Sequence, residues 1–231
     1  MTVVAELPYE EQWNKWSCGA ASLAMVYRSF GIECNQDQIW RGICGKSLQG
    51  RLCARAQSLA ATMLQSGLQA LMLQVRDPWL VLERCVQQSV RVIINHVSEP
   101  KSGGGHFSVL AGLGDDEVII HDPSLGPNRT LTRSAFLQLW NPRALTTEIP
   151  DQILIAIAKS TSKLGPCPLC DHIARDSFRC PSCQRSVSLQ PLAILGCLSD
   201  HCPMRAWEQI FCPFCDHAQP NRINPPKPGR E

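Results

Sequence analysis

The chain has 231 residues, of which 44% are hydrophobic and 18% charged, and its formal net charge is +2. This length suits one full domain plus a small one, and the composition is that of a globular protein with a substantial core. A charge this close to zero argues against a function based on general attraction to nucleic acid or anionic lipid.

Helical patterns dominate the first half of the chain. Apolar residues recur at helical spacing from Cys18 until Gly31 ends the pattern. Asn35 followed by Gln38 predicts a capped second helix, and Asp77 followed by proline predicts the start of a fourth. The predicted helices cover residues 18–31, 35–43, 50–65 and 77–88, with a strand at 71–75 before the last of them.

From Val90 onward the pattern changes to strands, predicted at residues 90–97, 106–113, 118–121, 129–131 and 151–158, with a helix from Thr132 to Trp140. Helices first and strands afterwards indicate an α+β fold with mostly antiparallel strands. We expect a main domain over residues 1–160, a cysteine-rich domain over 161–219, and a disordered, proline-rich tail over 220–231.

Cys18 stands at the start of a helix, with Gln12 six residues before it. A helix N-terminus stabilises a thiolate, because its dipole and unpaired N–H groups favour an anion. The other four cysteines of the first domain lack such an upstream motif, and we interpret them as small buried hydrophobes.

Three histidines in the strand region are candidate bases for this thiol. His106 follows a glycine-rich loop and begins a strand, so its ring could reach a helix terminus, and Asp122 lies one hairpin away, where it could orient the imidazole. We interpret His96 as a core or rim histidine, and we expect His121 to face away from Asp122. Taken singly, each histidine is more often structural than catalytic.

Over roughly residues 5–160 the chain resembles the papain-like double-glycine leader peptidases, which process bacteriocin precursors. The resemblance rests on Gln12…Cys18-Gly19-Ala20-Ala21, on Gly105-His106-Phe107-Ser108-Val109-Leu110, and on His121-Asp122-Pro123…Gly126. It implies a papain-like fold in which Cys18 is the nucleophile, His106 the base, Asp122 the orienting residue and Gln12 an oxyanion-hole donor. Two departures are Ser17, where many members have aspartate, and the absence of a fused exporter with its ATPase.

The implied function is that of a cysteine endopeptidase acting on a peptide or protein substrate, with specificity for a Gly-Gly type leader. Resolution of the thioester by an amine instead of water would make the same site an acyltransferase. A catalytically silent binding or adaptor protein is a further alternative, although an intact set of Gln, Cys, His and Asp argues for the enzyme.

Eight cysteines are concentrated in the last third of the chain, and the spacing C-x9-C-x2-C occurs twice with a period of 32 residues. Without a secretory signal this pattern indicates metal rather than disulfides, and hence the reducing cytoplasm. No apolar run approaches the ~18 residues of a membrane span. We expect two structural Zn²⁺ ions, each held by four thiolates, with the ligands Cys167, Cys170, Cys180, Cys183, Cys197, Cys202, Cys212 and Cys215.

The pairing of these ligands is open from the sequence, and we favour sequential sites over cross-braced or nested ones because they need only short loops. Thiolate charge outweighs the zinc charge in this segment, which disfavours nucleic-acid binding. A docking role for a protein partner or substrate fits better. Trp207, Ile210 and Phe211 could form that contact surface, or could equally be the core of the small domain.

Overall fold

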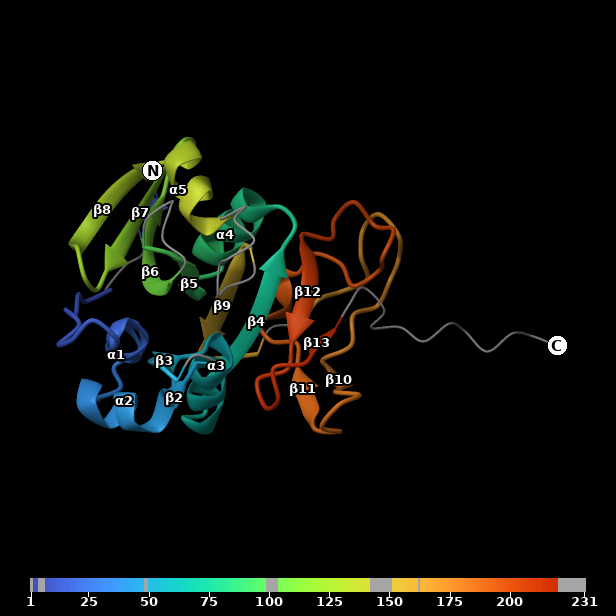
Figure 1. The fold of residues 1–231 in the computed structure, drawn as a ribbon. Helices are drawn as coiled ribbons and strands as arrows, with labels where there is room; N and C mark the ends of the chain where they lie inside the picture. The colour runs from blue at the N-terminus through green and yellow to red at the C-terminus, as the bar shows by residue number, and fades with distance from the viewer. Residues whose placement is uncertain are drawn as a thin grey trace.

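The computed structural model describes residues 2–3, 7–47, 50–98, 104–141, 151–161 and 163–219. A single antiparallel sheet runs through it, with helices on both faces (Figure 1). The strands follow the order β13-β12-β4-β9-β5-β6-β7-β8, and β1 (Thr2–Val3) pairs with the end of β6. The expected α+β architecture with antiparallel strands is therefore confirmed.

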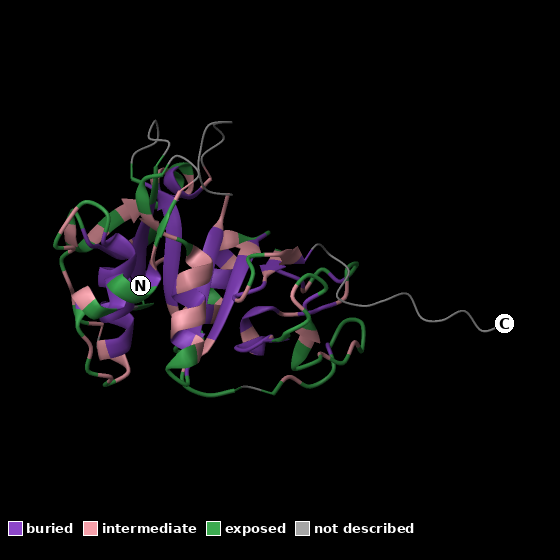
Figure 2. Cartoon of the chain, turned by 60° about the horizontal axis from the view of Figure 1, so that its bottom comes forward, coloured by how far each residue is buried: buried purple, intermediate pink, exposed green. Residues whose placement is uncertain are grey.

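The sheet is built mainly from long strands, which are apolar and almost entirely buried except for β8, whose residues are half-buried or exposed (Figure 2). The last long strand of the first domain inserts between two earlier ones and pairs antiparallel with both. The strands are β4 (Gln69–Val75), β9 (Ile153–Ala158), β5 (Arg91–Val97), β6 (Gly105–Leu113), β7 (Glu117–Asp122) and β8 (Gly126–Thr132).

Three helices cover one face of the sheet, namely α1 (Cys18–Ser29), α2 (Gln36–Ile43) and α3 (Ala56–Gln65). Helix α1 is the central one, and each of its residues from Cys18 to Tyr27 is buried. Its apolar side chains pack against alternate strand residues such as Met72, Ile93 and Val109. This core fixes the N-terminus of α1, and hence Cys18, against the sheet.

The opposite face carries α4 (Pro78–Gln87) and α5 (Arg133–Trp140), whose side chains pack on the other set of alternate strand residues. Asp77 and Thr132 cap these helices as the sequence predicts, because their side chains accept hydrogen bonds from backbone N–H groups of the first turns. Among the described residues, none of the helices is long and apolar enough to cross a bilayer.

The predicted third helix is too long at its start. Residues 52–54 form strand β3 (Leu52–Ala54), which pairs with β2 (Cys44–Lys46) in a small hairpin, and the helix begins only at Ala56. Leu52, at the start of this hairpin strand, is 44% exposed. The apolar residues from 52 to 64 fit a helical period, so the sequence does not show that residues 52–54 pair with residues 44–46. The predicted disordered tail, 220–231, lies outside the described residues.

The cysteine-rich segment joins the same sheet through β12 (Trp207–Phe211), which pairs antiparallel with β4, as Figure 1 shows. Its remaining elements are β10 (Ser177–Arg179), β11 (Ser186–Ser188), a 3-10 helix at Leu192–Ile194 and β13 (Ala218–Gln219). Trp207 and Ile210 are fully buried and share a core with residues of α4 and β4. They form neither an exposed docking surface nor the core of a separate unit.

Candidate active site and metal clusters

Cys18 begins α1 and is 8% exposed. Ser17, at the N-cap, makes no capping bond, because its hydroxyl donates to the carbonyl of Asn14 and accepts from the Asn14 N–H. Gly19 lets the helix start approach its neighbours, since a Cβ there would lie 3.1 Å from Ala54 Cβ and 3.3 Å from Leu59 Cδ1. The first turn thus keeps its N–H groups free of a side-chain cap beside the thiol.

His106 and Asp122 lie on neighbouring strands, at the end of the sheet nearest Cys18. The Nε2 atom of His106 is 2.8 Å from Oδ1 of Asp122, and both side chains are buried. Nδ1 is therefore the ring nitrogen that remains for Cys18, whose side chain is close enough to hydrogen bond to His106. The structure brings together the three side chains that the sequence singles out.

The carboxylate of Asp122 is 1% exposed and fully engaged. Besides His106, Oδ1 accepts hydrogen bonds from the backbone and hydroxyl of Ser124, at 2.9 and 2.8 Å, and from the Leu125 N–H at 3.2 Å. Oδ2 accepts a hydrogen bond of 2.6 Å from Nη1 of Arg129. These donors keep the carboxylate charged and fix its plane.

The charges of the two residues are mutually stabilised. Burial lowers the pKa of His106, but hydrogen bonds to Asp122 and Cys18 outweigh it and raise that pKa to about 9. Burial likewise raises the pKa of Asp122, but the bonds from His106 and Ser124 hold it well below its usual range. At neutral pH the pair is an imidazolium and a carboxylate, which suits a thiolate–imidazolium site.

His96 lies closer to this site than the sequence suggests. It is opposite His106 in the strand pairing, and the two rings meet edge to face with their centroids 5.3 Å apart. Its ring nitrogens are 2.7 Å from the Val97 carbonyl and 2.9 Å from Ser108 Oγ. Burial and the neighbouring His106 lower the pKa of His96 to about 4, so it packs as a neutral ring.

Gln12 belongs to an N-terminal segment that is fastened to the turn after Asp122. The Gln12 N–H donates to the Pro123 carbonyl at 3.0 Å, and the Tyr9 hydroxyl donates to the carbonyl of Asp122 at 3.3 Å. Nε2 of His121 bonds to the Leu7 carbonyl at 3.1 Å, on the side of β7 away from the Asp122 carboxylate. Oε1 of Gln12 is buried and has no hydrogen-bond partner among the described residues.

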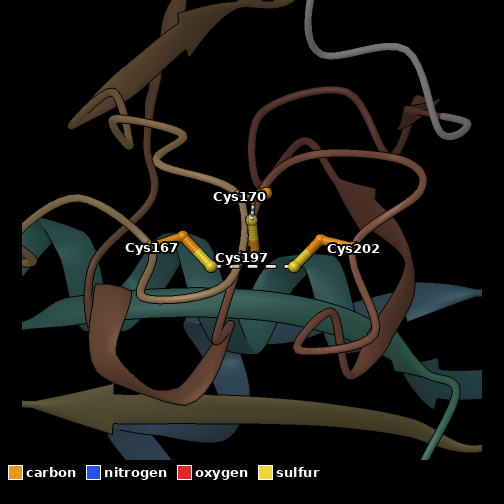
Figure 3. Close-up of side chains that lie close together, drawn as sticks. All are labelled: Cys167, Cys170, Cys197 and Cys202. Carbon is orange, nitrogen blue, oxygen red and sulfur yellow. Dashed lines mark hydrogen bonds between the residues drawn. The ribbon is translucent and has the colours of Figure 1, made fainter.

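The eight cysteines of the last third form two clusters of four, in each of which all sulfur atoms lie within 4.8 Å of one another. Figure 3 shows the first cluster, made of Cys167, Cys170, Cys197 and Cys202. The second is made of Cys180, Cys183, Cys212 and Cys215. The sequential pairing that we favoured is wrong, because each cluster takes one cysteine pair from each half of the segment.

The physical reason is packing rather than loop length. The second cluster joins the turn between β10 and β11 to the turn between β12 and β13, and β12 is held in place by β4. Loop-closure entropy grows only slowly with length, so the interleaved arrangement costs little.

The donor set fits a metal. Sulfur pairs lie 3.5–3.6 Å apart, far beyond a disulfide bond of about 2.05 Å and close to the ~3.8 Å edge of a tetrahedron with ~2.3 Å Zn–S bonds. Backbone N–H groups of Leu169 and His217 lower the pKa values of Cys167 and Cys215, respectively, to about 7. All 13 cysteines are free of disulfides. Two four-cysteine groups that could hold metal ions are thus present.

Comparison with known proteins agrees with this geometry. A family model described as the Peptidase C39 family matches residues 6–152, well over half of the chain. The chain belongs to the Peptidase C39 family. The resemblance to the double-glycine peptidases is thereby confirmed at the level of the family. The matched region ends before the cysteine clusters.

The chain is similar to a curated protein in sequence and to solved structures in fold. A probable functional amyloid protease, FapD, of Pseudomonas fluorescens is 27% identical over 132 residues, which cover 57% of this chain and 56% of that protein. The chain thus spans little more than half of that relative's length. A putative C39-like peptidase from Bacillus anthracis is 16% identical with a TM-score of 0.54, over 69% of this chain and 98% of that one.

The peptidase domain of Streptococcus ComA, a bifunctional ABC transporter involved in a quorum-sensing pathway, is 18% identical with a TM-score of 0.52. The match covers 67% of this chain and 99% of that one. Together with the Bacillus anthracis structure, it bears out the expected peptidase fold.

Several contacts around the candidate site could not be predicted from the sequence. Arg129 and Ser124 contact the Asp122 carboxylate, and His96 contacts the His106 ring. The spacing of His96 and His106 across a hairpin is compatible with pairing, but the register is visible only in the structure.

Proposed function

We propose that this C39 peptidase cleaves its substrate with Cys18 as nucleophile, His106 as general base and acid, Asp122 as orienting residue and Gln12 as oxyanion-hole donor. The observation that carries the proposal is the contact of His106 with Asp122 through Nε2, which leaves Nδ1 toward Cys18. The role of Gln12 rests on its place in the motif, six residues before Cys18, because its Oε1 atom is buried without a hydrogen-bond partner among the described residues.

In the proposed reaction the proton of Cys18 already resides on Nδ1 of His106 in the resting thiolate–imidazolium pair, and the Sγ thiolate attacks the scissile carbonyl carbon. The resulting oxyanion is held by the Gln12 amide and the Cys18 backbone N–H. The C–N bond breaks as the imidazolium protonates the leaving amine, and water then attacks the thioester with His106 as base. Losing one oxyanion donor typically lowers kcat by about 10²–10³.

For the substrate we propose a peptide cleaved after a Gly-Gly type leader, on the resemblance to double-glycine peptidases. The test is incubation with a panel of leader peptides ending in Gly-Gly, followed by mass mapping of the products. We expect cleavage by the native chain and none by Cys18→Ala or His106→Ala. Cleavage that survives Cys18→Ala would overturn the mechanism, and release of an amine adduct rather than an acid would favour acyl transfer.

We propose two Zn²⁺ ions as structural cofactors, one in each four-cysteine cluster. A closed set of four thiolates leaves no position for substrate, so the metal would supply folding energy rather than catalysis. The cysteine clusters without disulfides also support the proposal of a cytoplasmic protein.

Recruitment of substrate or a partner protein remains our proposal for the segment over residues 161–219. Leu169 and Ile173, exposed by 62% and 70%, replace Trp207 and Ile210 as its candidate contacts. A higher KM for a long substrate, with the KM of a short peptide unchanged, is expected for Leu169→Ser combined with Ile173→Ser. An unchanged KM for the long substrate in the double variant would contradict this role.

A further inference from the structure

The second oxygen of the Asp122 carboxylate has a partner that the proposed triad does not use. Oδ1 carries the contacts to His106, Ser124 and Leu125, whereas Oδ2 accepts the 2.6 Å hydrogen bond from Nη1 of Arg129. The Asp122 side chain is 1% exposed, and that of Arg129 is 27% exposed. A buried carboxylate held through both oxygens cannot turn about its final bond without losing a charged partner.

The pairing of β7 with β8 places Arg129 for this contact. Arg129 lies opposite Ile120, and the register shifts between Ile120 and Asp122, which pairs with Gly126. Directly paired residues share a face of the sheet, and Ile120 shares its face with Asp122 two residues on. The guanidinium therefore approaches Asp122 from β8 while His106 approaches from β6.

We propose that Arg129 is a positioning residue for the peptidase reaction, because its guanidinium holds Oδ2 of Asp122 and so keeps Oδ1 directed at His106. The inference rests on the proposed roles of Cys18, His106 and Asp122. Only one guanidinium nitrogen makes the contact, so a single cationic hydrogen bond is what the site requires.

The groups that face the pair come from four parts of the fold. His106 faces Cys18 on α1 and His96 on β5, while Asp122 faces Arg129 on β8 and the Tyr9 hydroxyl of the N-terminal segment. His96 is neutral above a pKa of about 4, so Arg129 is the cation that balances Asp122 alongside the imidazolium. Loss of the Arg129 contact lets the carboxylate turn, and the bond that stabilises charged His106 weakens.

The experiment compares the full native chain with Arg129→Met, Arg129→Lys and the control Arg41→Met, which removes an exposed Arg–Asp pair on α2. The readouts are the rate of Cys18 alkylation by iodoacetamide against pH, located by peptide mass mapping, and kcat and KM for a cleaved Gly-Gly peptide. Thermal melting of each variant reports folding.

We expect Arg129→Met to lower kcat about ten-fold with KM changed by less than about two-fold, as for loss of an indirect orienting contact. The pH of half-maximal alkylation should rise by about one unit, because a weaker Asp122 bond makes the imidazolium harder to form. Arg129→Lys should keep kcat within about three-fold of the native value, since lysine keeps one cationic donor. Its pH of half-maximal alkylation should lie within about a few tenths of a unit of the native value. Arg41→Met should match the native chain.

A fall in the pH of half-maximal alkylation would overturn the inference, because it would mean that Arg129 acts only as a nearby positive charge. An unchanged pH profile with a lower melting temperature would overturn it as well, by showing a purely structural ion pair. Asp122→Asn separates this failure from failure of the triad. If Asp122→Asn leaves the kinetics unchanged, the triad is wrong. If Asp122→Asn abolishes cleavage and Arg129→Met does not reduce it, only the role of Arg129 is wrong.

Discussion

At the residue scale, the structure explains why His106 is charged in the resting site. Its ring is buried, which opposes a charge, yet its bonds to Asp122 and Cys18 prevail and give it a pKa of about 9. The pKa of His96, whose ring contacts that of His106 edge to face, is instead lowered to about 4. Of the two paired histidines on adjacent strands, His106 is thus charged and His96 neutral at neutral pH, because only His106 bonds to a carboxylate.

This charge state predicts the pH dependence of folding. The pKa of His106 is raised above its ordinary value of 6.5, so its stabilising contribution is fully present below about pH 6.5 and is lost as the pH rises through about 9. We expect the free energy of unfolding to fall by about 2–3 kcal/mol over that range. Urea titrations at several pH values should show this slope, and His106→Ala should flatten it. An equal slope in both proteins would contradict the assignment.

The depressed pKa of His96 predicts the opposite sign at acid pH. Its contribution is present above about pH 6.5 and is lost as the pH falls through about 4, because protonation would place a charge in a closed site beside His106. We expect the isosteric variant His96→Asn to weaken this acid-side loss of stability. Melting temperatures between pH 6.5 and 4 that fall equally in both proteins would show that other groups cause the loss.

At the element scale, the attachment of the cysteine-rich segment depends on close backbone approaches. Gly196 adopts a positive φ of 73° and leaves no room for a side chain, because a Cβ would collide with the Met204 carbonyl and the Arg84 guanidinium. Arg84, on α4, donates to the carbonyls of Ile194 and Met204. One residue of α4 therefore ties two stretches of the segment to the peptidase fold.

Gly196→Ala tests this attachment. The methyl group meets backbone and guanidinium atoms in a left-handed conformation, so we expect destabilisation of about 2–4 kcal/mol, a decrease of several degrees in melting temperature. Gly165→Ala is a matched control, since a Cβ there would meet nothing within 4 Å. Equal melting temperatures for the two variants would contradict the packing described.

The elements were predictable where the apolar pattern is clear, as for α1 and the strands from β5 to β7, and where a capping residue supports it, as for α4. The hairpin β2–β3 was not, because its short strands carry no alternation of their own and depend on each other. The candidate site residues Cys18, His106 and Asp122 could be proposed from the sequence because their motifs are local. The partners Arg129 and His96 are set by strand register, and the interleaved cysteines by the β12–β4 pairing, which local sequence does not specify.

At the scale of the whole molecule, the second cysteine cluster and the candidate peptidase site are connected through one sheet. Strand β12 extends the sheet beyond β4, and Gln57 at the start of α3 donates to the Pro213 carbonyl in the turn of the second cluster at 2.7 Å. Helix α3 in turn carries Leu59 against Gly19, next to Cys18. A short series of direct contacts thus leads from the second cluster to the neighbourhood of Cys18.

Metal removal should therefore destabilise the whole described fold. We expect about two zinc ions per purified chain, and a strong chelator should lower the melting temperature by at least about 10 °C in a single transition. Calorimetry with and without chelator, together with metal analysis, checks this. An unchanged main transition after complete metal loss would mean that the peptidase fold does not depend on the clusters.

The central claim is that Cys18 is an activated nucleophile paired with His106. Alkylation by iodoacetamide at pH 6, quantified for each cysteine by peptide mass mapping, tests it most directly, with the partly buried Cys34, Cys44 and Cys53 as internal references. The account predicts that Cys18 reacts at least about ten-fold faster than these thiols, although it is more buried, and that His106→Ala removes the difference. Equal rates in the native chain, or a rate at Cys18 that is indifferent to His106→Ala, would contradict it.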